Sequence, residues 1–115
     1  MTVTIYHNPR CSKSRTTLGL LEEQGVEPEI INYLETPPDA ATLKKLLAML
    51  GLSPRDILRK KEKEYRELGL ADEGLSDNEL IRAIIEHPRL MERPIVVKNG
   101  RAALGRPPES VLEIL

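Results

Sequence analysis

The sequence predicts an α/β protein with a mixed four-stranded sheet and a helical insertion in its middle. Near the amino terminus, β-like segments at residues 2–6 and 29–34 flank a helical pattern, with the spacing of a βαβ unit. Near the carboxyl terminus, Asn99-Gly100 stands between two apolar runs and favours an antiparallel hairpin with a type I′ turn. Between these two parts, capping boxes and mixed-charge runs favour helices.

Local signals mark the first helix and its flanking strands. Val3 and Ile5 alternate with polar neighbours, which is typical of a half-buried strand. The apolar period that follows predicts a helix from about residue 12 to 24, and Gly25 suits its C-cap. A strand, a helix and a strand in this order predict a right-handed crossover between parallel strands.

The predicted helical insertion covers approximately residues 39–88. The apolar face of its first helix holds four leucines: Leu43, Leu46, Leu47 and Leu50. Capping boxes begin at Ser53 and Ser76, and the last helix should stop before Pro88, because a residue preceding a proline is kept out of the α region. The mixed-sign run at 59–67 is typical of a solvated helix.

The chain returns to β-structure after the insertion. Apolar runs at 95–97 and 102–104 flank the Asn-Gly pair and predict the last two strands. Pro107 then opens a short final helix. Because 115 residues suffice for one core, we expect residues 1–115 to form a single domain.

Composition and charge exclude several classes of function. The net charge is -1 and the only aromatic residues are three tyrosines, so we expect no nucleic-acid partner. One cysteine cannot form an internal disulfide, which suits a reducing compartment, and no apolar run approaches the length of a membrane span. We therefore expect a cytoplasmic protein with no membrane partner.

The loop between the first strand and the first helix holds the only cysteine, Cys11. A helix start offers free backbone N–H groups and the positive end of the helix dipole, and both favour an anion. The thiolate is the nucleophilic form of cysteine. Three basic residues stand near Cys11 in the sequence, namely Arg10, Lys13 and Arg15. We therefore predict that Cys11 is a reactive thiol rather than a small buried side chain.

Other residues could assist this thiol. His7 could donate a hydrogen bond to the thiolate or pair with it electrostatically, and Ser14 could cap the helix or donate to the sulfur. Three arginines stand where elements begin or end, Arg59, Arg93 and Arg106, and arginine binds tetrahedral oxyanions through its planar set of donors. Periodicity does not bring them together in space. No cluster of histidine, cysteine or carboxylate residues has metal-ligand spacing, so we expect no metal.

The chain resembles the ArsC family, the glutaredoxin-linked arsenate reductases, and in particular its short YfgD-like branch. The similar segments extend along the whole chain and lie at residues 5–11, 14–15, 33–38, 58–60, 67–71, 93–97 and 106–107. The resemblance implies a thioredoxin-like fold with a helical insertion. It also implies a cis peptide bond between Arg93 and Pro94.

The resemblance further implies an activity. Cys11 would be the nucleophile, His7 would help to activate it, and Ser14 would support the thiolate. The arsenate-binding residues would be three arginines, Arg59, Arg93 and Arg106. Arsenate would be reduced to arsenite without a bound cofactor, with glutathione and glutaredoxin as external electron donors. Because Ser14 stands where a dithiol enzyme has its second cysteine, an outside thiol must take over the oxidised sulfur.

Two other functions stay open. The Spx proteins share this fold and bind RNA polymerase, although they commonly carry a Cys-x-x-Cys pair that Ser14 interrupts here. A monothiol redox protein would be reduced by glutathione without binding arsenate. The sequence also departs from the arsenic-resistance enzymes of the family, which usually have a longer C-terminal tail and a small uncharged pair in place of Ser12-Lys13.

Overall fold

The computed structural model describes residues 2–115, which form two compact units. The sheet unit consists of the chain up to Thr36 together with Arg93–Leu115, and the helical unit is Pro37–Glu92. A single domain over 1–115, with an insertion at approximately 39–88, stays a prediction.

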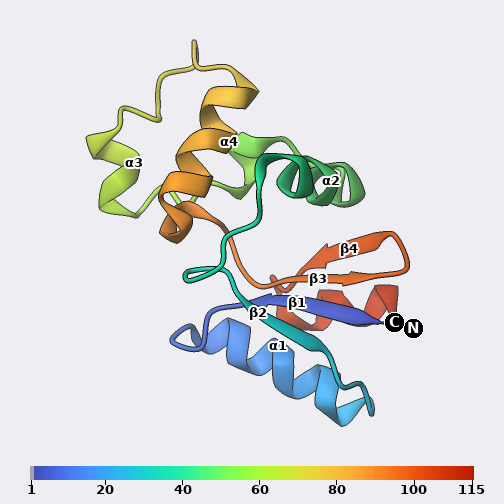
Figure 1. The fold of residues 1–115 in the computed structure, drawn as a ribbon. Coiled ribbons are helices and arrows are strands. Elements are labelled where there is room, and N and C mark those ends of the chain that lie inside the picture. Colours follow the sequence, from blue (N-terminus) through green and yellow to red (C-terminus); the bar gives the residue numbers. More distant parts are fainter. Residues whose placement is uncertain (1) are drawn as a thin grey trace. The chain divides into compact units, whose positions relative to one another are not determined.

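The sheet unit contains a mixed four-stranded sheet, as the sequence predicts (Figure 1). Its strands, in the spatial order β2-β1-β3-β4, are β1 (Val3–His7), β2 (Glu29–Asn32), β3 (Ile95–Lys98) and β4 (Arg101–Leu104). β1 pairs in parallel with β2 and antiparallel with β3, and β3 pairs antiparallel with β4. Asn99 and Gly100 both have positive φ, as the type I′ turn of the predicted hairpin requires.

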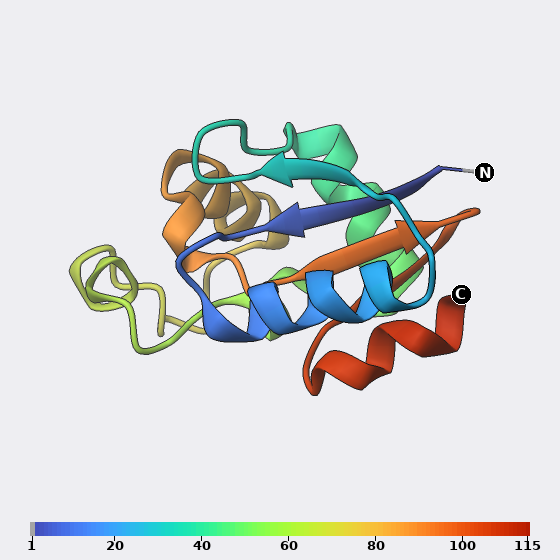
Figure 2. The same cartoon turned by 90° about the horizontal axis from the view of Figure 1, so that it is seen from below.

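Two helical segments cover one face of this sheet. They are α1 (Ser12–Glu23) and the 3₁₀ helix η3 (Pro108–Ile114), which lie side by side (Figure 2). The aliphatic core beneath them consists of Val3, Ile5, Leu21, Val96, Val111 and Ile114. Successive side chains of a strand point to opposite sides of the sheet, so Val3 and Ile5, which are two positions apart in β1, point to the same side.

The helical unit contains short helices joined by capped turns. They are α2 (Ala40–Leu50), η1 (Pro54–Ile57), α3 (Lys63–Glu67), α4 (Asp77–Glu86) and η2 (Pro88–Leu90). The predicted capping boxes form at Ser53 and at Ser76, and Asp39 accepts a hydrogen bond from the Thr42 N–H at 2.8 Å. Within residues 2–115, no helix combines the length and the apolar composition needed to cross a membrane.

One helix expected in this unit is shorter than the charge pattern suggests. The prediction of a helix over 59–67 is wrong in its first part, because only Lys63–Glu67 is helical. Leu58 instead forms an isolated antiparallel bridge with Met91, and the Arg59 N–H donates to the Leu90 carbonyl at 2.8 Å. This pairing is long-range in sequence, so a local charge pattern does not reveal it.

Candidate active site

One end of the sheet collects the candidate residues of the sheet unit. The register pairs Tyr6 of β1 with Ile95 of β3, and Ile95 with Leu104 of β4. The loop that follows β1, the Arg93-Pro94 peptide that precedes β3 and the Gly105-Arg106 peptide that follows β4 therefore lie at the same end. The register of the sheet thus brings together three segments that are far apart in the sequence, which sequence spacing could not predict.

Cys11 lies at the start of α1 as its N-cap, in an extended conformation with φ -95° and ψ 124°. Its N–H donates to the Asn8 carbonyl at 3.0 Å, and its carbonyl accepts from the Arg15 N–H at 3.0 Å. The N–H groups of residues 12–14 then have no acceptor within the helix, as in any first helical turn. The thiol is half-buried and makes no capping hydrogen bond. The side chain of an N-cap residue is the one that can reach the free N–H groups of the first helical turn.

Ser14 connects this loop to His7. Its fully buried Oγ accepts from the Asn8 N–H at 3.0 Å and lies 2.6 Å from His7 Nδ1. A serine hydroxyl can donate one hydrogen bond and accept two, so Oγ donates to Nδ1 in the tautomer that carries its proton on Nε2 and accepts from Nδ1–H in the other. The Ser14 hydroxyl therefore holds the histidine and the loop together, and does not cap the helix.

The charge state of His7 follows from its surroundings. Burial, and secondly the positive charge of Arg15, lower the pKa of His7 below its usual value. A neutral imidazole is therefore favoured at neutral pH. A neutral imidazole can still donate a hydrogen bond, but it carries no positive charge to pair with a thiolate.

The lowered pKa of His7 predicts a pH dependence of stability. A depressed folded-state pKa contributes stability that is present above the unfolded-state value of about 6.5 and is lost as the pH falls through the folded-state value. We expect the Tm to fall between about pH 7 and pH 5, and to fall less in His7→Gln, which cannot titrate there. Thermal unfolding followed by circular dichroism checks this. Equal pH profiles for the two proteins would contradict a lowered pKa at His7.

Arg93 and Arg106 are in contact at the open end of the hairpin, just before β3 and just after β4. Arg93 is buried with 8% exposure, and its Nε and Nη1 have no hydrogen-bond partner among the described residues. Arg106 Nε donates to the Arg93 carbonyl at 3.3 Å. The cis Arg93–Pro94 peptide is confirmed, and Arg106–Pro107 is also cis, which the sequence did not indicate. Since buried donors without acceptors are unfavourable, Arg93 is suited to receiving an anion.

Gly105 allows the segment that follows β4 to approach both Pro94 and the cysteine-bearing helix closely. A Cβ at position 105 would lie 2.6 Å from Thr17 Oγ1 and 2.6 Å from Pro94 Cγ. The Gly105 N–H donates to the Pro94 carbonyl at 2.9 Å, and Thr17 is buried in α1. No sequence pattern singled out Gly105, although a glycine directly before the Arg106-Pro107 pair was a usable signal.

Arg59 belongs to the helical unit, where carboxylates surround it. Its Nη1 lies 2.6 Å from Glu62 Oε1 and its Nε lies 3.9 Å from Glu92 Oε1. Arg59 stands two residues after the end of η1 and directly follows the bridge at Leu58. Neither carboxylate partner was expected from the sequence.

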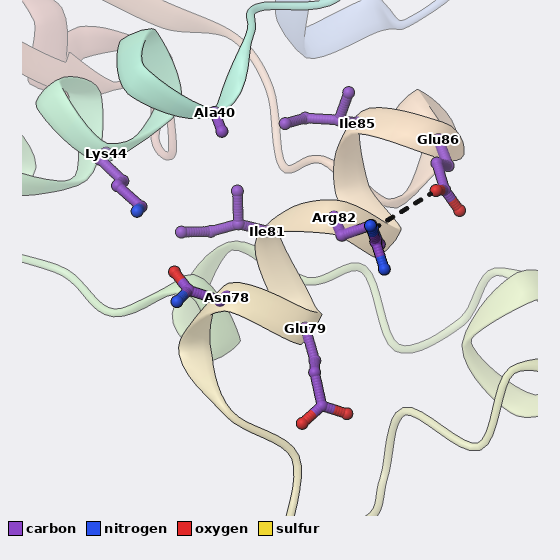
Figure 3. Close-up of a pocket in the computed structure, with 8 residues that line it drawn as sticks. All are labelled: Ala40, Lys44, Asn78, Glu79, Ile81, Arg82, Ile85 and Glu86. Atoms are coloured by element: carbon purple, nitrogen blue, oxygen red, sulfur yellow. Dashed lines mark ion pairs between the residues drawn. The ribbon is translucent and has the colours of Figure 1, made fainter.

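The helical unit also has a hollow between α2 and α4 (Figure 3). Ile81 and Ile85 extend from α4 toward α2, and Arg82 pairs with Glu86 at 3.8 Å. The hollow contains none of the predicted site residues. In the part of the chain that the structure describes, no group of three or more histidine, cysteine or acidic residues could hold a metal ion.

The chain is similar over nearly its whole length to known proteins. The family model described as ArsC family matches residues 6–114. Uncharacterized protein YfgD of Escherichia coli (strain K12) is 64% identical over 98% of this chain and 96% of its own length. A protein of Neisseria meningitidis named arsenate reductase is 52% identical over 98% of this chain and 97% of its own length. The structure of an arsenate reductase from Vibrio cholerae matches with a TM-score of 0.97 and 59% identity, over 100% of this chain and 98% of that one, which confirms the thioredoxin-like fold.

Proposed function

This chain belongs to the ArsC family, and from that membership we propose that it reduces arsenate to arsenite. Relatives named arsenate reductase cover 98% of its length, which supports an oxidoreductase that acts on an oxyanion. One observation carries the proposal. The buried Arg93, with two unpartnered nitrogens, lies at the same end of the sheet as the loop that presents Cys11 at a helix start.

The proposed binding site is built for a tetrahedral oxyanion. Arsenate would accept hydrogen bonds from the N–H groups of the first turn of α1 and from the free donors of Arg93. Arg106 would complete the arginine pair of the sheet unit, and the family resemblance adds Arg59 as a third arsenate-binding residue. An anion held there would satisfy the donors of Arg93 that the protein itself leaves without acceptors.

The proposed chemistry uses Cys11 as the nucleophile. Its thiolate forms a bond to arsenic, and one arsenic–oxygen bond breaks as that oxygen leaves as water. His7 Nε2–H can donate to the thiolate or to the departing oxygen, while Ser14 keeps Nδ1 engaged. A glutathione thiol then displaces a second oxygen from arsenic, and glutaredoxin completes the reduction. Overall, arsenic takes up two electrons as two glutathione thiols become one disulfide, with release of arsenite and water and return of Cys11 to the thiol.

The test of this proposal is arsenite formation by the purified protein. Arsenate, glutathione and glutaredoxin are supplied together, and each is then omitted in turn. We expect turnover only when all are present. Absence of arsenite in the complete mixture, with an intact Cys11 thiol, would contradict the proposal. A rise in Tm with arsenate or sulfate separates an oxyanion-binding enzyme from a monothiol redox protein, because only a ligand that binds the folded state raises the Tm.

Arg93→Lys tests whether the planar donors of arginine matter. The substitution keeps the positive charge but loses the fork of N–H groups, so we expect the KM for arsenate to rise about tenfold. Steady-state kinetics measure the change. Arg101→Lys, at an exposed position of β4, is the matched control and should leave the KM unchanged. An unchanged KM in Arg93→Lys would remove Arg93 from the proposed site.

A further inference from the structure

The backbone of Arg59 is fixed by pairing with a distant segment. Its N–H donates to the Leu90 carbonyl at 2.8 Å, and the Glu92 N–H donates to the Ile57 carbonyl at 2.8 Å, on either side of the Leu58–Met91 bridge. Two backbone hydrogen bonds thus fix the main chain around Arg59. What its guanidinium can bind then depends on the side chains around it.

Glu62 is the principal partner of that guanidinium. It is the N-cap residue of α3, but its side chain makes no capping hydrogen bond. The carboxylate instead points to Arg59, with 2.6 Å between Oε1 and Nη1, and its Oε2 lies 3.6 Å from Arg89 Nη2. The Glu62 side chain is only 17% exposed. A carboxylate turned away from its own helix and held by two arginines is fixed in place.

The cluster formed by Arg59, Arg89, Glu62 and Glu92 contains two positive and two negative side chains. Glu92 adds a second carboxylate, whose Oε1 is 3.9 Å from Arg59 Nε. Arg59 Nη2 takes part in neither of these contacts. An anion that approaches Arg59 therefore finds one amino group outside the two carboxylate contacts, on a guanidinium whose positive charge is already partly offset.

We propose that Glu62 is a positioning residue that orients Arg59 and offsets part of its charge, so that an oxyanion has to compete with this carboxylate for the guanidinium. The inference rests on the proposed function, in which Arg59 binds arsenate. It follows that Glu62 weakens the binding of every oxyanion at the site, including anions that cannot be reduced. Charge and hydrogen bonding make separate contributions, and substitutions can separate them.

Glu62→Gln removes the charge and keeps an oxygen that can accept from Arg59. We expect the KM for arsenate to fall about two- to fivefold with kcat unchanged, and competitive inhibition by sulfate to strengthen by a similar factor. Glu62→Ala removes the hydrogen bond as well, so its KM should lie above that of Glu62→Gln. Glu67→Gln, at an exposed position of α3, loses the same charge and should match the wild type.

A second readout does not depend on turnover. An arginine whose nitrogens hold a carboxylate reacts slowly with phenylglyoxal, so labelling of Arg59, located by peptide mass spectrometry, should be faster in Glu62→Gln than in Glu67→Gln. If the wild type forms arsenite from arsenate but the two variants do not differ, the inference is overturned and the proposed function stands. If labelling accelerates while no oxyanion raises the Tm of any variant, the proposed function fails, and the inference fails with it.

Discussion

Replacing Cys11 with serine is expected to lower arsenite formation by at least about three orders of magnitude, to the background rate. The serine hydroxyl is a far weaker nucleophile than a thiolate, and an oxygen at this position cannot exchange with the sulfur of glutathione. Cys11 is the only cysteine, so no other thiol of the chain can replace it. Arsenite release is measured with saturating glutathione and glutaredoxin.

The same substitution should not harm the fold, which makes it a clean test. The Cys11 side chain makes no capping hydrogen bond, and serine is among the preferred N-cap residues, so we expect the free energy of unfolding to rise by about 0.5–1 kcal/mol. A Cys11→Ser protein that is folded and inactive supports the nucleophile assignment. A folded variant that still forms arsenite would show that a group other than Cys11 is the nucleophile.

Gly105→Ala should destabilise the fold strongly, although it adds only one methyl group. Its Cβ would lie 2.6 Å from both Thr17 Oγ1 and Pro94 Cγ, so α1 or the hairpin must shift. Overpacking of this kind costs about 1–3 kcal/mol of unfolding free energy. Urea denaturation measures the loss, and removal of the colliding oxygen by Thr17→Ala in the same background should restore part of it.

Gly19→Ala is the matched control for this substitution. Gly19 lies inside α1, and a Cβ there would have nothing within 4 Å. Because alanine favours a helix over glycine, we expect a gain of about 0.5–1 kcal/mol. A Gly105→Ala protein as stable as Gly19→Ala would contradict the close approach of the hairpin to α1.

The parts of the fold that local chemistry determines could be predicted from the sequence. Three local patterns each predict one element: the alternation of Val3 and Ile5 predicts a strand, the apolar period after Cys11 predicts a helix, and Asn99-Gly100 predicts a hairpin. The mixed sheet follows from the order of these elements. The position of Cys11 at a helix start could be predicted in the same way, because the neighbouring residues mark both the strand and the helix.

Contacts between distant segments could not be predicted in this way. Arg93 and Arg106 are brought to one end of the sheet by strand register, and the need for glycine at 105 comes from the approach of three segments at once. The mixed charges of the run at 59–67 are typical of a solvated helix. The structure shows that Glu62 instead pairs with Arg59 and Arg89, a geometry that depends on the bridge to Met91.

The most direct test of the central claim is the mass of Cys11 during turnover. The protein is incubated with arsenate and glutathione but without glutaredoxin, quenched in acid and analysed by intact-protein and peptide mass spectrometry. We expect an adduct of arsenic or glutathione on the Cys11 peptide that requires arsenate and disappears when glutaredoxin is added. An unmodified Cys11 peptide under these conditions, in a sample that goes on to release arsenite, would contradict the role of Cys11 as the nucleophile.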